Sequence, residues 1–63
     1  MAGERETIFE FIRIGGALKV CAVDAETGIE AVLIADPAAA EEALTRLAQQ
    51  KLDYVLAKQR PAG

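Results

Sequence analysis

Two adjacent glycines, Gly15 and Gly16, separate two runs of β-branched and aromatic residues, and this arrangement constrains the fold more than any other feature of the chain. The runs cover residues 8–14 and 17–23, and their residue types favour strands. Glycines can adopt the positive φ values that a two-residue turn requires, both of them in type I′ and the first alone in type II′. The sequence therefore predicts a β-hairpin whose register is fixed by its loop.

A second turn and a third strand are predicted after the hairpin. Residues 24–28 read Asp-Ala-Glu-Thr-Gly. Asp24 can accept backbone hydrogen bonds and Gly28 can take a left-handed conformation, so this stretch is typical of a turn. Residues 29–35 are again mostly apolar, which predicts a third antiparallel strand. A four-residue loop would place Asp24 opposite Ile29.

Helix signals follow the third strand. Asp36 suits the N-cap position, and Pro37 suits the first helical position, where no N–H donor is needed. Apolar residues then recur with helical spacing in a stripe flanked by Leu52 and Tyr54. The members of the stripe are Ala40, Leu44, Leu47, Ala48 and Val55.

Lys51 lies near the middle of this apolar stripe and leaves two interpretations open. The helix can continue past Lys51, which the Ala, Leu, Gln and Lys content of the segment favours. Alternatively, it ends near Gln50 and residues 52–56 form a fourth strand, because apolar residues alternate there.

These elements predict an α+β domain of β-β-β-α order: a three-stranded antiparallel meander with one C-terminal helix packed on one face. Residues 1–63 form one small domain, with an ordered core of roughly residues 7–58 and short flexible tails at both ends. A chain of this length buries only about 60% of its unfolded surface, so oligomerisation is an expected supplement to its own core.

Alternation along the strands predicts two sheet surfaces. The helix face, which carries Phe9 and Phe11, is apolar apart from Arg13, and we expect the helix to cover it, burying Phe11 and Leu47. The opposite surface, the open face, has no helix left to cover it. Its members are Ile8, Glu10, Ile12, Ile14, Lys19, Cys21, Val23, Glu30, Val32 and Ile34.

The open face is the candidate interaction surface. Seven of its ten residues are apolar, and a contiguous apolar patch of this size usually marks a contact. The strand of residues 8–14 is also long, apolar and at the edge of a meander, and such edges tend to pair. We therefore expect a homodimer, formed either by pairing two edges or by stacking two open faces.

The composition argues against most chemistry. Cys21 is the only cysteine and the chain has no histidine, which excludes an internal disulfide and leaves too few ligands for a zinc site. Cys21 has Lys19 and Glu10 as neighbours on the open face, but a nucleophilic role would need a base and an oxyanion hole. We expect a small buried residue there, no cofactor and no metal, and a protein that is not an enzyme.

Charge and hydropathy restrict the partners. The net charge of −3 offers little attraction to a phosphate backbone. Nucleic-acid binding through Arg13 and Lys19 is retained as the alternative function, and a small enzyme as a weaker one. No apolar run has the length of about 18 residues that a membrane span needs. The single cysteine fits a reducing cytoplasm.

Three segments carry a resemblance to a known family. They are Phe-Glu-Phe-Ile-Arg-Ile-Gly-Gly at residues 9–16, Val-Asp-Ala-x-Thr-Gly at residues 23–28, and Lys-Leu-x-Tyr-Val-Leu-Ala-Lys at residues 51–58. With these segments the chain resembles a small family of uncharacterised bacterial proteins, a domain of unknown function. The resemblance implies no catalytic residue and no cofactor.

Overall fold

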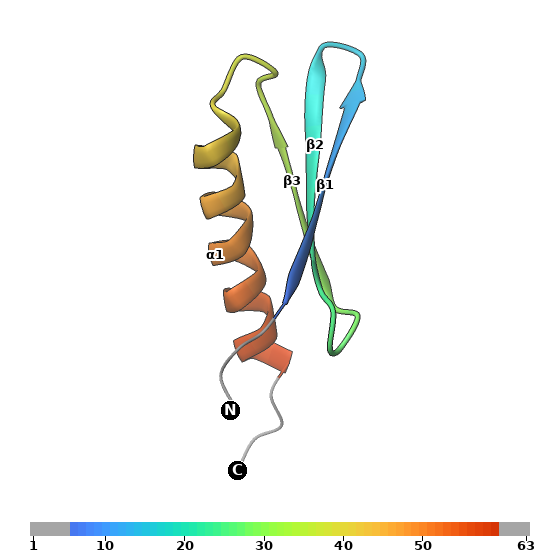
Figure 1. The fold of residues 1–63 in the computed structure, drawn as a ribbon, viewed down its shortest axis with the longest axis vertical. Helices are drawn as coiled ribbons and strands as arrows, with labels where there is room; N and C mark the ends of the chain where they lie inside the picture. Colours follow the sequence, from blue (N-terminus) through green and yellow to red (C-terminus); the bar gives the residue numbers. More distant parts are fainter. Residues whose placement is uncertain (1–5, 60–63) are drawn as a thin grey trace.

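The computed structural model describes residues 6–59 as three strands followed by one helix (Figure 1). The elements are β1 (Thr7–Ile14), β2 (Ala17–Asp24), β3 (Glu30–Ala35) and α1 (Glu41–Gln59). The strands form one antiparallel sheet in the order β1-β2-β3. This β-β-β-α arrangement confirms the predicted fold class. The flexible tails expected at the two ends lie outside the described residues.

The strand register agrees with the one that the turns predict. Phe11 lies opposite Val20, which in turn lies opposite Leu33. At the second turn the Asp24 N–H donates to the Ile29 carbonyl at 2.8 Å, as a four-residue loop requires. Since a slip of one residue would move every side chain to the other face, this agreement also confirms which residues share each surface.

The first turn is of the kind that needs one glycine rather than two. Gly15 has φ of 58°, whereas Gly16 is not among the residues with positive φ. A positive φ at the first central position alone is the signature of a type II′ turn. Of the two turn types that the sequence allowed, the structure therefore selects type II′, and only Gly15 needs to be glycine for its backbone.

This difference gives a matched pair of variants. Gly15→Val is expected to lower the free energy of unfolding by about 1 kcal/mol or more, because a β-branched residue is strained at positive φ. Gly16→Val should change it much less. A Cβ at either position has no neighbour within 4 Å, so crowding affects neither variant. Urea unfolding of both proteins measures the difference, and equal losses would contradict the type II′ assignment.

The second turn is built around the carboxylate of Asp24. Its Oδ2 accepts hydrogen bonds from the Thr27 backbone N–H at 3.0 Å and from the Thr27 hydroxyl at 2.8 Å. The Gly28 N–H donates to the Asp24 carbonyl, and Gly28 has φ of 78°. Asp24 is buried, with an exposed fraction of 0%. Two donors of Thr27 thus hold one carboxylate oxygen of this buried side chain within the turn.

The predicted start of the helix at Asp36 and Pro37 is wrong. Asp36 Oδ1 accepts from the Ala38 N–H at 2.8 Å and the Asp36 carbonyl accepts from the Ala39 N–H at 2.9 Å, so Asp36 organises a turn. The first helical hydrogen bond runs from the Leu44 N–H to the Ala40 carbonyl. The chain must leave the end of β3 and reverse direction over the sheet, and this connection uses the residues that the capping signals assign to the helix.

The helix is continuous past Lys51 and ends at Gln59, so the alternative fourth strand at residues 52–56 is wrong. Lys51 projects from the flank of α1 rather than into the core, and its Nζ donates to the Val32 carbonyl of β3 at 2.6 Å. A long side chain can run along apolar surface to reach such a polar partner, which is how the helix tolerates a cation beside its apolar stripe.

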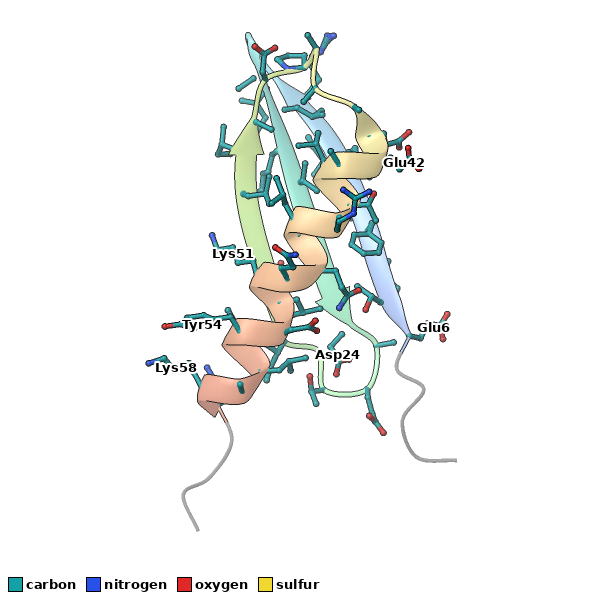
Figure 2. The ribbon with its side chains drawn as sticks, turned by 90° about the vertical axis from the view of Figure 1, so that its left-hand side faces the viewer. Glu6, Asp24, Glu42, Lys51, Tyr54 and Lys58 are labelled. Atoms are coloured by element: carbon teal, nitrogen blue, oxygen red, sulfur yellow. The ribbon has the colours of Figure 1, made fainter. Side chains whose placement is uncertain are left out.

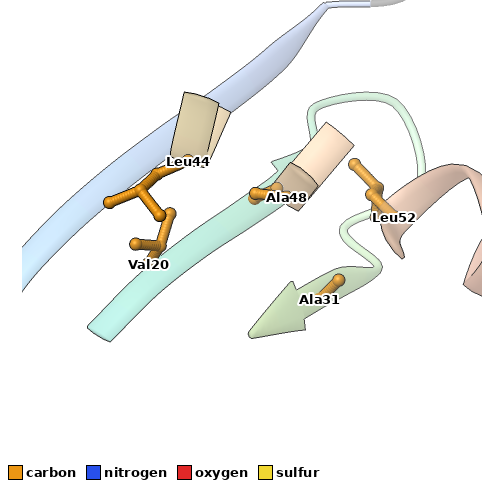
Figure 3. Close-up of a cluster of buried hydrophobic side chains, with 6 residues drawn as sticks. Val20, Ala31, Leu44, Ala48 and Leu52 are labelled. Atoms are coloured by element: carbon orange, nitrogen blue, oxygen red, sulfur yellow. The ribbon is translucent and has the colours of Figure 1, made fainter. Parts of the chain in front are cut away.

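The core lies between α1 and the sheet (Figure 3). The helix contributes Leu44, Ala48 and Leu52 at intervals of one turn, and they contact small residues of β2 and β3. The cluster of buried apolar residues consists of Val20, Ala22, Ala31, Leu44, Ala48 and Leu52. The short side chains of the two strands allow the helix to approach the sheet closely.

The position of α1 over the sheet corrects one core prediction. The helix packs on β2 and β3 and makes at most minor contact with β1. Phe11 is therefore half-buried and packs at the margin of the core, which confirms the helix face but not full burial. Leu47 was expected in the core and is 52% exposed, because it lies on the flank of the helix.

Candidate interaction surface

The structure brings the ten residues of the open face together on the side of the sheet opposite α1. Phe9 and Phe11 pack against the core, so the residues that alternate with them along β1 point to the other side. The register then aligns the three strands in rows, among them Glu10-Cys21-Val32 and Ile12-Lys19-Ile34. No element within residues 6–59 covers this side of the sheet.

Four isoleucines make the open face apolar at its surface. Their exposed fractions are 49% for Ile8, 41% for Ile12, 53% for Ile14 and 63% for Ile34. Three of the four come from β1, the strand at the edge of the sheet. Exposed apolar side chains gathered on one face usually mark a binding surface.

The polar members of the open face do not assemble a reactive site. Cys21 is only 5% exposed, as expected for a small residue on a central strand. Glu10 lies directly opposite Cys21, and Lys19 lies opposite Ile12. Within residues 6–59 there is no group of three His, Cys, Asp or Glu side chains that could hold a metal ion. The polar residues of the open face thus lie among apolar ones, on a surface that is suited to contacts.

Arg13 and Lys19, which the nucleic-acid alternative combines, lie on opposite faces of the sheet. Arg13 pairs with Leu18 on the helix face, and Lys19 pairs with Ile12 on the open face. One phosphate backbone would need both cations on one surface to use them together.

Within residues 6–59, no strand pairs with the outer edge of β1. The Ala25 N–H donates to the Glu6 carbonyl at 3.0 Å, which shows that even-numbered residues of this segment direct their backbone groups toward β2. Alternate residues of an antiparallel pair exchange hydrogen bonds. The odd-numbered residues therefore direct their N–H and C=O groups away from the sheet: Thr7, Phe9, Phe11 and Arg13.

The outer edge of β3 is different, because α1 reaches it with a side chain. In Figure 2, Lys51, Tyr54 and Lys58 all project from the same side of α1, beside β3. The Lys51 ammonium donates a hydrogen bond to the Val32 carbonyl, which points away from the sheet. A lysine placed at a sheet edge hinders the approach of another strand. The two edges of this sheet are thus unlike each other.

The sequence did not indicate that the side of α1 next to β3 is exposed. Tyr54 is 62% exposed, and the Lys58 Nζ lies 5.5 Å from the centre of its ring. Leu47, seven residues earlier on the same side of α1, is also exposed. The helical stripe is wide enough to include both residues, so periodicity alone could not separate core from flank.

Fold and surface define a small sheet-and-helix domain with one uncovered sheet face and two unlike sheet edges. The chain belongs to the family described as a domain of unknown function (DUF6898), whose model matches residues 4–59. Searches among curated proteins and among solved structures returned no match. No helix within residues 6–59 is long and apolar enough to cross a membrane.

Proposed function

We propose that this domain is a small protein-interaction module that forms a homodimer through the open face and the adjoining edge of β1. The observation that carries the proposal is the exposure of four isoleucines on a face that no described element covers. We further propose that it has no catalytic activity and that it works in a bacterial cytoplasm; its single cysteine fits a reducing compartment.

Domain size supports self-association. Only short side chains and three helical residues make up the buried cluster. A domain with so small a core is marginal alone, and an oligomeric contact adds the apolar burial that it lacks. A symmetric contact between two copies uses the same patch twice, so a face with both apolar and charged residues can complement itself. Nucleic-acid binding has no comparable support, since its two candidate cations lie on opposite faces.

Sedimentation equilibrium over a series from micromolar to millimolar concentration tests the proposal. The expected mass is twice that of the 6.7 kDa chain. Ile14→Lys should shift the equilibrium toward monomer, because it places a charge in the proposed contact. Leu47→Lys is the matched control: Leu47 is 52% exposed against 53% for Ile14, but it lies on the helix flank.

The control variant is expected to keep the wild-type mass. A wild-type chain that stays monomeric at millimolar concentration would refute the homodimer. Loss of dimer in Leu47→Lys but not in Ile14→Lys would place the contact on the helix rather than on the open face.

A further inference from the structure

We infer that two copies pair through the outer edges of β1, antiparallel and about a two-fold axis at Phe11, to form one six-stranded sheet. This inference rests on the proposed self-association and names its geometry. It also selects between edge pairing and face stacking, which the sequence leaves open.

The two sheet edges give the first argument. Phe9, Phe11 and Arg13 direct their backbone N–H and C=O groups outward from β1, and the backbone of α1 makes at most minor contact with this strand. At the other edge, the Val32 carbonyl already accepts the Lys51 ammonium. The outward N–H and C=O groups of β1 are therefore the ones that can hydrogen-bond to a second copy. Outward groups on both chains would form the hydrogen-bonded pairs of a new antiparallel ladder.

Parity restricts the register of this ladder. Hydrogen bonds form only if odd-numbered residues of one copy lie opposite odd-numbered residues of the other. Two symmetric registers give the longest overlap, one centred on Glu10 and one centred on Phe11. The first places Glu10 opposite Glu10 of the second copy, and like charges directly opposite are unfavourable. Centring on Phe11 avoids this repulsion.

Side chains on both surfaces fit the Phe11 register. On the helix face, Arg13 lies opposite Phe9 of the second copy, where its guanidinium can contact the ring. This would account for the single cation among the β1 residues of that face. On the open face, Ile8 lies opposite Ile14 of the second copy, so two of the exposed isoleucines gain apolar neighbours.

Ile12 gives the sharpest test, since in this register it lies opposite Glu10 of the second copy and opposite Lys19 of its own chain. Ile12→Glu should raise the dimer dissociation constant roughly tenfold, through two symmetric like-charge pairs. Ile12→Lys should leave it unchanged or lower it, because the new cation faces a carboxylate. Sedimentation equilibrium of both variants measures the constants.

Changes in the stability of the folded monomer would not produce this order of dissociation constants. Within one chain, Glu at position 12 would face the cation of Lys19 and Lys would face a like charge, so Ile12→Glu should be the more stable monomer. Its dimer should nevertheless be the weaker one. Face stacking predicts the reverse order of dissociation constants, because Ile12→Lys would then gather cations around Lys19. Observation of that reverse order would overturn edge pairing while leaving the homodimer intact.

Disulfide trapping tests the register directly. Glu10→Cys and Ile12→Cys proteins, each with Cys21→Ala to remove the native thiol opposite position 10, are mixed and oxidised. The Phe11 register places position 10 beside position 12 of the second copy, at the close spacing of a non-hydrogen-bonded pair. A covalent heterodimer is expected. Cross-linking of Glu10→Cys to itself instead would refute this register, and a monomeric wild type would refute self-association as a whole.

Discussion

Replacing Leu52 with alanine is expected to lower the free energy of unfolding by about 2–5 kcal/mol. Leu52 is 0% exposed and is the largest fully buried side chain among residues 6–59. Its removal would leave a cavity between α1 and the sheet, which so small a core cannot easily refill. A loss of this size is comparable to the whole stability of many small domains, so we expect a large unfolded fraction of this variant in buffer.

Leu47→Ala is the control for this prediction. It makes the same change in the same helix, at a residue that is 52% exposed, so helix propensity changes equally in both variants. The expected loss is below about 1 kcal/mol. Urea unfolding followed by far-ultraviolet circular dichroism, at one fixed protein concentration, compares them. A larger loss for Leu47→Ala would contradict the observed position of α1 over the sheet.

Asp24→Ala is expected to lower the free energy of unfolding by about 1–3 kcal/mol, because it removes the acceptor of two hydrogen bonds from Thr27. Those bonds hold the turn between β2 and β3, so their loss also weakens the alignment of β3. The burial of Asp24 means that water cannot simply replace its carboxylate.

Asp24→Asn separates shape from charge at this turn. The amide oxygen can still accept from the Thr27 N–H and hydroxyl, although a neutral acceptor is weaker than a carboxylate. We expect a smaller loss of stability than for Asp24→Ala, measured by the same urea titration. Equal losses in the two variants would show that charge, rather than the presence of an acceptor, is what the turn requires.

The sheet was predictable from the sequence because its signals are local. The Gly15-Gly16 pair and the Asp24–Gly28 turn fix loop lengths, and loop length fixes register through alternation. The membership of the open face followed directly, including the small buried Cys21. The choice between a type I′ and a type II′ turn could not be made from the sequence, because glycine suits both turns.

The helix was less predictable because its start and its position depend on the rest of the fold. Asp36 and Pro37 carry genuine capping chemistry, but the chain needs those residues to turn from β3 onto the sheet. Leu47 belongs to the apolar stripe by spacing, yet α1 lies over β2 and β3 and turns this residue outward. Local patterns do not specify where a helix axis lies on a sheet.

The Lys51 contact also bears on how far an assembly of this chain can grow. A sheet with two open edges can add copies at both ends and grow into a fibre. A sheet with one open edge stops growing once that edge is paired. Under the proposed pairing, the two β1 edges are consumed in the middle of the dimer. Both outer ends are then β3, each with a Lys51 ammonium on its Val32 carbonyl, which hinders the addition of a third copy.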